Sequence, residues 1–90
     1  MPRIIFTESY EKRAMKFLKR HPELKSQYLK VLQLLAINPL HPSLRLHKLK
    51  GKLSMLQSIS INLIYRIVMQ FIVKEDLIIP IDVGSHDEVY

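Results

Sequence analysis

The chain has 90 residues, of which 48% are hydrophobic, so it is long enough for one domain with a modest core and too short for two. It contains no cysteine, which excludes disulfide bonds and thiolate metal sites and fits a reducing cytoplasm. Fourteen lysines and arginines against eight acids give a net charge of +6, and a small basic domain often binds a polyanion or an acidic protein. No apolar run is long enough to span a bilayer and the N-terminus does not resemble a secretory signal, so we expect a cytoplasmic protein with no membrane contact.

The first twenty residues predict a strand and then a helix. Residues 3–6 (RIIF) are a short β-rich run. Thr7 follows as a helix N-cap, with two glutamates in the next turn, where the helix dipole favours acids. Apolar side chains then recur at helical spacing, which predicts an amphipathic helix that ends near Arg20.

A second helix should follow almost at once. Pro22 suits the first position of a helix, and the helical period continues to about residue 37, where Asn38 and Pro39 end it. Because the link between the two helices is so short, they should form an αα-hairpin. Residues 38–51 hold two prolines and several basic residues, and we expect a loop there.

From Lys52 onward the hydrophobic period changes from 3.6 to 2, which predicts strands. The first runs to about residue 61, the second covers 63–71 and the third covers 77–83, where Pro80 must face an edge or a bulge. The order predicts a single α+β domain over residues 1–90. It has an N-terminal strand, an αα-hairpin and a three-stranded antiparallel meander, with the helices packed on one face of the sheet.

Most signatures of catalysis and of cofactor binding are absent. The only glycines, Gly51 and Gly84, are too far apart to form a phosphate-binding loop. His41 and His47 lie six residues apart across a proline loop, which is a weak spacing for a metal site. We therefore expect neither a metal nor a cofactor.

The remaining polar residues fall where this topology would gather them. If Tyr65, Ile67 and their alternating neighbours pack beneath the helices, Arg66 lies on the opposite, open face of the sheet, and Asp82 alternates likewise on the next strand. Further candidate residues come from the end of the last strand and from the loop before the first of the three late strands: His86, Asp87, Tyr90, His47, Lys48, Lys50 and Lys52.

Such a cluster suits cleavage of an RNA backbone. That reaction needs a base to deprotonate a 2′-hydroxyl, an acid to protonate the leaving 5′-oxygen and cations to neutralise charge on the phosphate. Histidine can serve as the acid or the base, a guanidinium grips phosphate and a tyrosine can stack on a nucleobase.

Each candidate also has a purely structural interpretation. Arg66 could pair with Asp82 across the sheet, His86 could cap the last strand, and Tyr90 could pack its ring on the sheet edge. The three lysines could form an ordinary solvated face. His21 and His41 both precede a proline and fit turns better than sites.

Three segments resemble the RelE/ParE superfamily of toxins from type II toxin–antitoxin systems: HPSLRLHKLKGKLS, then YRIV, and finally DVGSHDEVY at the C-terminus. The resemblance extends over essentially the whole chain and is greater to the RelE and YafQ side than to the ParE side. It implies a compact, metal-independent ribonuclease that enters the ribosomal A site and cuts mRNA. It also implies a cognate antitoxin that blocks the toxin, the pair often repressing its own operon through operator DNA.

The resemblance also implies roles for individual residues. His47 matches the histidine of the family's H-x-L-x-G segment, Arg66 the basic residue of the Y-[RK]-[IL] strand, His86 the late catalytic histidine and Tyr90 the C-terminal aromatic. The implied RNA-binding residues are basic and come from the loop before the late strands: Arg45, Lys48, Lys50 and Lys52.

The chain departs from the family pattern at three positions. Val83 stands where YafQ-like toxins have an arginine, Gln57 where many relatives have an aromatic and Ser60 where many have an arginine. Three alternatives to a ribosome-dependent endonuclease therefore stay open: a ParE-type toxin that poisons gyrase, a catalytically weakened member that mainly binds its antitoxin or operator, and a general nucleic-acid binder.

Overall fold

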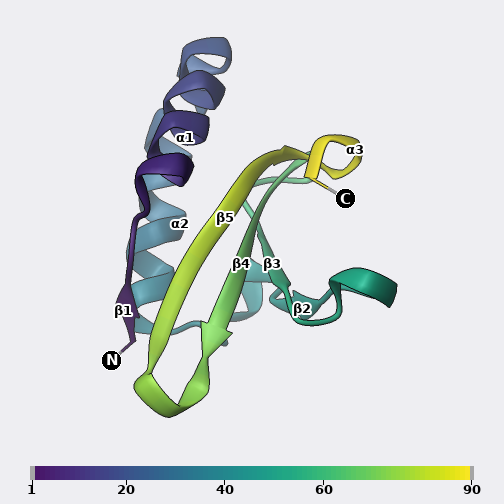
Figure 1. The fold of residues 1–90 in the computed structure, drawn as a ribbon. Helices are drawn as coiled ribbons and strands as arrows, with labels where there is room; N and C mark the ends of the chain where they lie inside the picture. The colour runs from purple at the N-terminus through teal and green to yellow at the C-terminus, as the bar shows by residue number, and fades with distance from the viewer. Residues whose placement is uncertain (1, 90) are drawn as a thin grey trace.

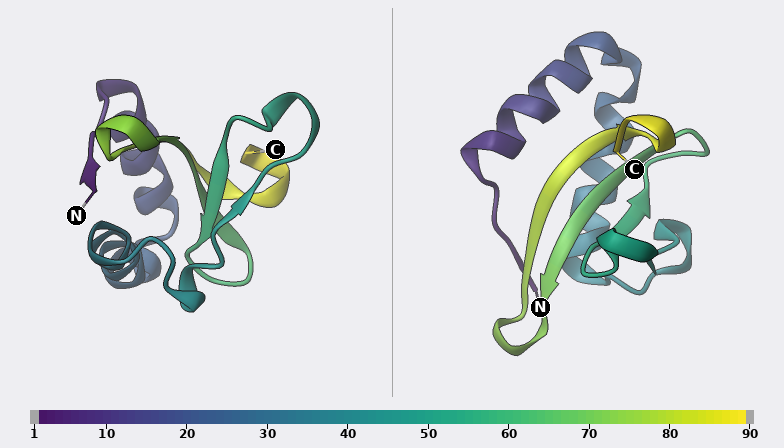
Figure 2. Two further views of the ribbon diagram at one scale, coloured as in Figure 1. Left: turned by 90° about the horizontal axis from the view of Figure 1, so that it is seen from below. Right: turned by 45° about the vertical axis from the view of Figure 1, so that its right-hand side comes forward.

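A computed structural model describes residues 2–89, with Glu88 described in its backbone only. Two helices, α1 (Glu8–Arg20) and α2 (Lys25–Ile37), cover one face of a five-stranded mixed sheet, as Figures 1 and 2 show. The strands are ordered β1-β5-β4-β3-β2 across the sheet. The predicted α+β fold, with its αα-hairpin and its helices on one face, is confirmed.

The first helix begins and ends where the sequence predicts, and the second ends there but begins three residues later than Pro22. The Thr7 side chain accepts a hydrogen bond of 3.1 Å from the Tyr10 N–H and so caps α1. The second helix starts with a 3₁₀ turn, Pro22–Leu24, that leads directly into α2. His21 alone separates the two helical segments, and this short link folds them back into a hairpin.

The predicted meander is present as three consecutive antiparallel strands: β3 (Gln57–Ser60), β4 (Tyr65–Ile72) and β5 (Leu77–Ser85). The N-terminal strand β1 (Arg3–Ile4) is shorter than predicted and pairs with β5 in parallel. Five strands rather than four form the sheet, since β2 (His47–Lys48) adds an edge that the sequence did not predict.

Residues 38–56 differ most from the prediction. The segment 38–51 is not wholly a loop, because His47 pairs with Ser58 across β2 and β3. The next strand starts at Gln57 rather than at Lys52, because a 3₁₀ turn at Gly51–Leu53 comes first. Gly51 has φ +68°, a left-handed conformation that glycine adopts without strain, and it turns the chain there.

Alternate residues of the strands face opposite sides, as predicted. Ile59, Ile67 and Met69 are fully buried against the helices, in a core that includes Tyr10 and Leu35. The opposite side, which we call the open face, presents the residues between them along β3 and β4: Ser58, Ser60, Arg66, Val68 and Gln70.

A β-bulge in β5 breaks the alternation on that strand. Val68 pairs with Asp82 and Met69 with Pro80, so Ile81 has no partner on β4. Pro80 therefore lies beside a bulge, as its missing N–H predicts. Asp82 lies opposite Val68, as the predicted alternation requires, but its carboxylate contacts Arg13 of α1.

Candidate active site

One pocket on the open face brings together the two histidines that the sequence motifs single out. It is lined by His47, Lys48, Leu49, Lys50, Leu53 and His86 and has a volume of about 350 Å³. We call it the histidine pocket. Its walls are the β2–β3 connection and the short helix α3 (His86–Val89), both of which lie on the side of the sheet away from α1 and α2 in Figure 1.

His47 is oriented by its neighbours in the chain and in the sheet. Its Nδ1 lies 3.0 Å from the carbonyl oxygen of Arg45, and its Nε2 lies 3.4 Å from the Ser58 hydroxyl. A carbonyl oxygen can only accept, so Nδ1 must hold the proton in this contact. In the neutral ring, Nε2 then has the lone pair that a general base needs, and it accepts from the Ser58 hydroxyl in this structure.

His86 is placed by the end of β5, where the chain turns into α3. Its Nδ1 lies 3.6 Å from a carboxylate oxygen of Asp87, and both side chains are largely exposed to solvent. An exposed contact of this kind contributes little to stability. His86 lies at the end of the last strand and is also one of the residues that line the histidine pocket.

Arg66 lies on the open face as predicted but is not among the residues that line the histidine pocket. It pairs with Ser60 on one side and with Gly84, two residues before His86, on the other. Its Nε is buried and has no hydrogen-bond partner among the residues that the structure describes. A buried donor of this kind is costly unless something else accepts from it, which is consistent with a site for an anion.

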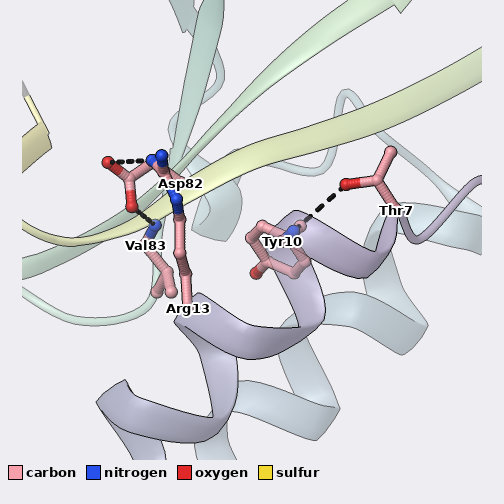
Figure 3. Close-up of polar contacts among 5 residues, drawn as sticks. All are labelled: Thr7, Tyr10, Arg13, Asp82 and Val83. Atoms are coloured by element: carbon pink, nitrogen blue, oxygen red, sulfur yellow. Dashed lines mark hydrogen bonds and ion pairs between the residues drawn. The ribbon is translucent and has the colours of Figure 1, made fainter.

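Asp82 is not the partner of Arg66. Its carboxylate lies 3.2 Å from the guanidinium of Arg13 on α1 and also accepts a hydrogen bond of 2.8 Å from the Val83 N–H (Figure 3). The predicted alternative of an Arg66–Asp82 pair is therefore wrong, because the side chain of Asp82 reaches Arg13 on α1 instead.

The basic residues predicted to bind RNA fall into three groups. Lys48 and Lys50 line the histidine pocket. Lys52 is exposed in the neighbouring 3₁₀ turn, outside the lining. Arg45 has a left-handed backbone (φ 51°) and lines a different pocket, together with Gln27 and Ser60. Tyr90 lies outside the described residues.

The three departures from the family pattern occupy different places. Val83 is buried opposite Ile67 and packs in the helix-covered core, so its side chain faces away from the histidine pocket. Ser60 is nearly buried on the open face beside Arg66. Gln57 lies at the β2–β3 edge and lines a groove with Phe71.

Two apolar residues of the pocket, Leu49 and Leu53, were missed by sequence reasoning. Leu49 is buried, although it is not part of the core beneath the helices. The signal was the alternation in HKLKG, which places Leu49 two residues after His47 and on the same side of an extended chain. Within residues 2–89, no group of three or more His, Asp and Glu side chains is arranged to hold a metal ion.

Comparisons with solved structures agree with this description. A metal-bound toxin of Helicobacter pylori is 27% identical, with all of both chains covered and a TM-score of 0.79. YafQ of Escherichia coli is 16% identical over all of this chain and 99% of its own, with a TM-score of 0.80, and is also known in a toxin–antitoxin complex with DinJ. A YoeB/ParE toxin of Agrobacterium tumefaciens is 16% identical, covers 93% of this chain and 98% of its own, and has a TM-score of 0.71.

The chain has the RelE/ParE toxin fold. The resemblance that the three sequence segments indicate is thus confirmed at the level of the fold, over the full length of the chain. No family model matches the chain, and no curated protein sequence matches it either. None of the helices in residues 2–89 has both the length and the apolar character of a membrane span.

Proposed function

We propose that this chain is the toxin of a type II toxin–antitoxin system and that it acts as a ribosome-dependent mRNA endonuclease. The toxin assignment follows the solved neighbours, which are toxins. The endonuclease activity is inferred from one observation: His47 and His86, 39 residues apart in the chain, line a single pocket together with two lysines.

The proposed reaction is cleavage by an internal 2′-hydroxyl. Nε2 of His47 takes the proton from the 2′-hydroxyl, whose oxygen then attacks the neighbouring phosphorus. The bond from phosphorus to the 5′-oxygen breaks, and His86 donates a proton to that oxygen. The products are a 2′,3′-cyclic phosphate and a 5′-hydroxyl. All atoms come from the RNA and the two imidazoles, and no cofactor is required.

Cations stabilise the charge that grows on the phosphate in this scheme. Lys48 and Lys50 are at the pocket, and the unpartnered Nε of Arg66 is available on the same face of the sheet. Removing a single preorganised donor of this kind typically lowers kcat by about 100- to 1,000-fold. Arg45 and Lys52 would contact RNA outside the pocket. We propose that Tyr90 stacks on a nucleobase.

The proposed partners are an antitoxin, the ribosome with its mRNA, and operator DNA bound through the antitoxin complex. The DinJ–YafQ complex supports the first of these, since DinJ binds a toxin of this fold. The cytoplasm, where ribosomes and mRNA meet, is the compartment that this function requires.

The deciding experiment compares wild type with His47→Ala and His86→Ala in a reconstituted translation reaction, with cut sites mapped by primer extension. We expect each substitution to lower the cleavage rate by about 100- to 10,000-fold, the usual contribution of a general acid or base. His41→Ala is the matched control, because the His41 side chain forms a hydrogen bond with Ser43 and does not line the histidine pocket. This variant should cleave mRNA at the wild-type rate.

Other results would point to other functions. Intact mRNA together with inhibited DNA supercoiling would identify a gyrase poison. Normal growth on strong induction without antitoxin would identify a protein that only binds its antitoxin or operator. Binding to RNA that falls steeply with salt but needs no ribosome would identify a general nucleic-acid binder.

A further inference from the structure

The main chain at Arg45 has a conformation that arginine does not favour. Within residues 2–89, three residues have a positive φ: Gly51, Asp76 and Arg45. Glycine adopts this left-handed region without strain and aspartate visits it readily, whereas it is uncommon for a long side chain. Arg45 has φ 51° and ψ 45°, at the end of the 3₁₀ turn Pro42–Leu44. Strained positions of this kind cluster at functional sites.

The carbonyl group of Arg45 is oriented by this conformation, because the ψ angle of a residue sets the direction of its own carbonyl. The oxygen lies 3.0 Å from Nδ1 of His47, two residues along the chain. The turn is held on both sides, since Leu44 is only 1% exposed in the core and His47 pairs with Ser58 of β3. The Arg45 N–H also donates to the Pro42 carbonyl at 3.2 Å. The carbonyl oxygen of Arg45 is therefore fixed beside the imidazole.

The His47 ring makes hydrogen bonds with Arg45 and with Ser58, and only the first selects a tautomer. The Ser58 hydroxyl, 3.4 Å from Nε2, can donate or accept and so suits either form of the neutral ring. The Arg45 carbonyl can only accept, so it requires the proton on Nδ1 and leaves the lone pair on Nε2. The hydrogen bond of one ring nitrogen decides the protonation of the other. The main chain at Arg45 thus determines which nitrogen of His47 can act as a base.

We propose that Arg45 is a positioning residue for the cleavage reaction: its left-handed main chain holds the carbonyl oxygen against Nδ1 of His47 and keeps the proton off Nε2. The proposal rests on the proposed endonuclease function and adds to it a residue that acts through its backbone. The Arg45 side chain is exposed and lines a different pocket, with Gln27 and Ser60, so substitutions can separate the effect of the main chain from that of the guanidinium.

The test compares two substitutions of Arg45 that remove the same charge. Asparagine tolerates the left-handed region, whereas a β-branched valine is a genuine outlier there. Because both variants lose the guanidinium, Arg45→Asn and Arg45→Val should raise KM for mRNA-programmed ribosomes to the same extent. Only Arg45→Val should also lower kcat, by about 10- to 100-fold relative to Arg45→Asn, since a misplacement of about 1 Å can cost about 100-fold in rate.

The tautomer itself is measured on the protein alone, by nitrogen NMR of the two His47 ring nitrogens in a pH series that reaches the neutral ring. Wild type and Arg45→Asn should carry the proton on Nδ1. Arg45→Val should show it shared between Nδ1 and Nε2. Asp76→Val is the matched control, because Asp76 also has a left-handed backbone (φ 54°) but does not line the histidine pocket. This control should keep the wild-type tautomer.

Equal kcat values for Arg45→Asn and Arg45→Val would overturn the proposal and leave Arg45 a role through its guanidinium alone. An unchanged tautomer in Arg45→Val would overturn it as well. So would a wild-type His47 ring with its proton on Nε2, a measurement that does not depend on the folding of any variant. If wild type cleaves no mRNA on the ribosome, the endonuclease is rejected, and the NMR comparison alone then decides whether Arg45 sets the tautomer of His47.

Discussion

The two faces of the sheet are built from alternate residues of the same strands, yet they have opposite characters. On the helix-covered face, Ile59, Ile67 and Met69 are completely buried. On the open face, β3 and β4 present two serines, Arg66 and Gln70 among their side chains. The comparison shows that apolar burial is concentrated on one face, which leaves the other able to hold polar groups without a large loss of stability.

The open face is not uniformly uncovered. Ser58 and Val68 are buried there, since the β2–β3 connection meets Ser58 through His47 and α3 packs against β4. These two coverings are also the walls of the histidine pocket. The candidate site therefore lies where small secondary elements close over the open face, in line with the general tendency of functional residues to sit on loops held by a rigid scaffold.

The largest effects on stability and activity should come from separate substitutions of two adjacent residues of β4, one on each face of the sheet. Ile67→Ala removes a fully buried side chain and should lower the free energy of unfolding by about 2–5 kcal/mol. Arg66→Met keeps an unbranched chain and removes a buried donor without a partner, so it should change stability by no more than about 1 kcal/mol. Urea denaturation measures both.

Cleavage assays on the same two variants separate a loss of activity from a loss of stability. Arg66→Met should lose activity while it stays folded, and Ile67→Ala should lose activity only to the extent that it unfolds at the assay temperature. A folded Arg66→Met protein with wild-type cleavage would contradict the assignment of activity to the open face and of stability to the helix-covered face.

A smaller effect is expected from a polar pair inside the helix-covered core. Tyr10 and Tyr28 are buried, and their hydroxyl groups lie 2.8 Å apart. Tyr10→Phe leaves the Tyr28 hydroxyl without its partner and should cost about 1–3 kcal/mol. The Tyr10→Phe/Tyr28→Phe double variant removes both groups and should cost less than the sum of the single variants.

The same pair predicts a loss of stability at alkaline pH. Burial raises the pKa of both Tyr10 and Tyr28 above the ordinary value of a tyrosine, about 10. Above that pH the unfolded chain releases these protons and the folded chain retains them, so the free energy of unfolding falls as the pH rises. Each tyrosine contributes a slope of up to about 1.4 kcal/mol per pH unit. Urea denaturation from about pH 8 to 11 should show a shallower fall for the double phenylalanine variant.

Sequence patterns predicted the helices and the meander because those elements depend on local chemistry. The Thr7 cap, Pro22 at a helix start and the alternation around Ile67 each act within a few residues. The pairing of His47 with Ser58 was not predictable in this way, since a two-residue strand has no period and exists only because β3 offers it an edge.

The candidate site was predictable in part. His47 and His86 came from motifs and the lysines from the basic loop, and the structure brings four of these residues to one pocket. Leu49 and Leu53 were missed because their place in the pocket depends on how the β2–β3 connection folds over the sheet. The partner of Asp82 was predicted wrongly, because its carboxylate pairs with Arg13 on α1, a contact between distant parts of the chain that no local pattern indicates.

The smallest effect is expected at Asp82. This residue tests the comparison directly, because it lies at the boundary between the two faces. Its ion pair with Arg13 is partly exposed, with side-chain exposures of 28% for Asp82 and 52% for Arg13, so solvent screens it. Asp82→Asn keeps an oxygen that can accept from the Val83 N–H and loses only the charge. We expect a loss of no more than about 1 kcal/mol in urea denaturation at low salt. The difference from wild type should shrink at about 1 M salt, where charges are screened over roughly 3 Å.

Arg13→Gln and the Asp82→Asn/Arg13→Gln double variant complete a mutant cycle with an expected coupling of a few tenths of a kcal/mol. Since the carboxylate of Asp82 meets α1 and does not line the histidine pocket, cleavage by Asp82→Asn should equal that of wild type. A marked change in cleavage without a change in stability would show that Asp82 also acts on the open face, where it lies opposite Val68.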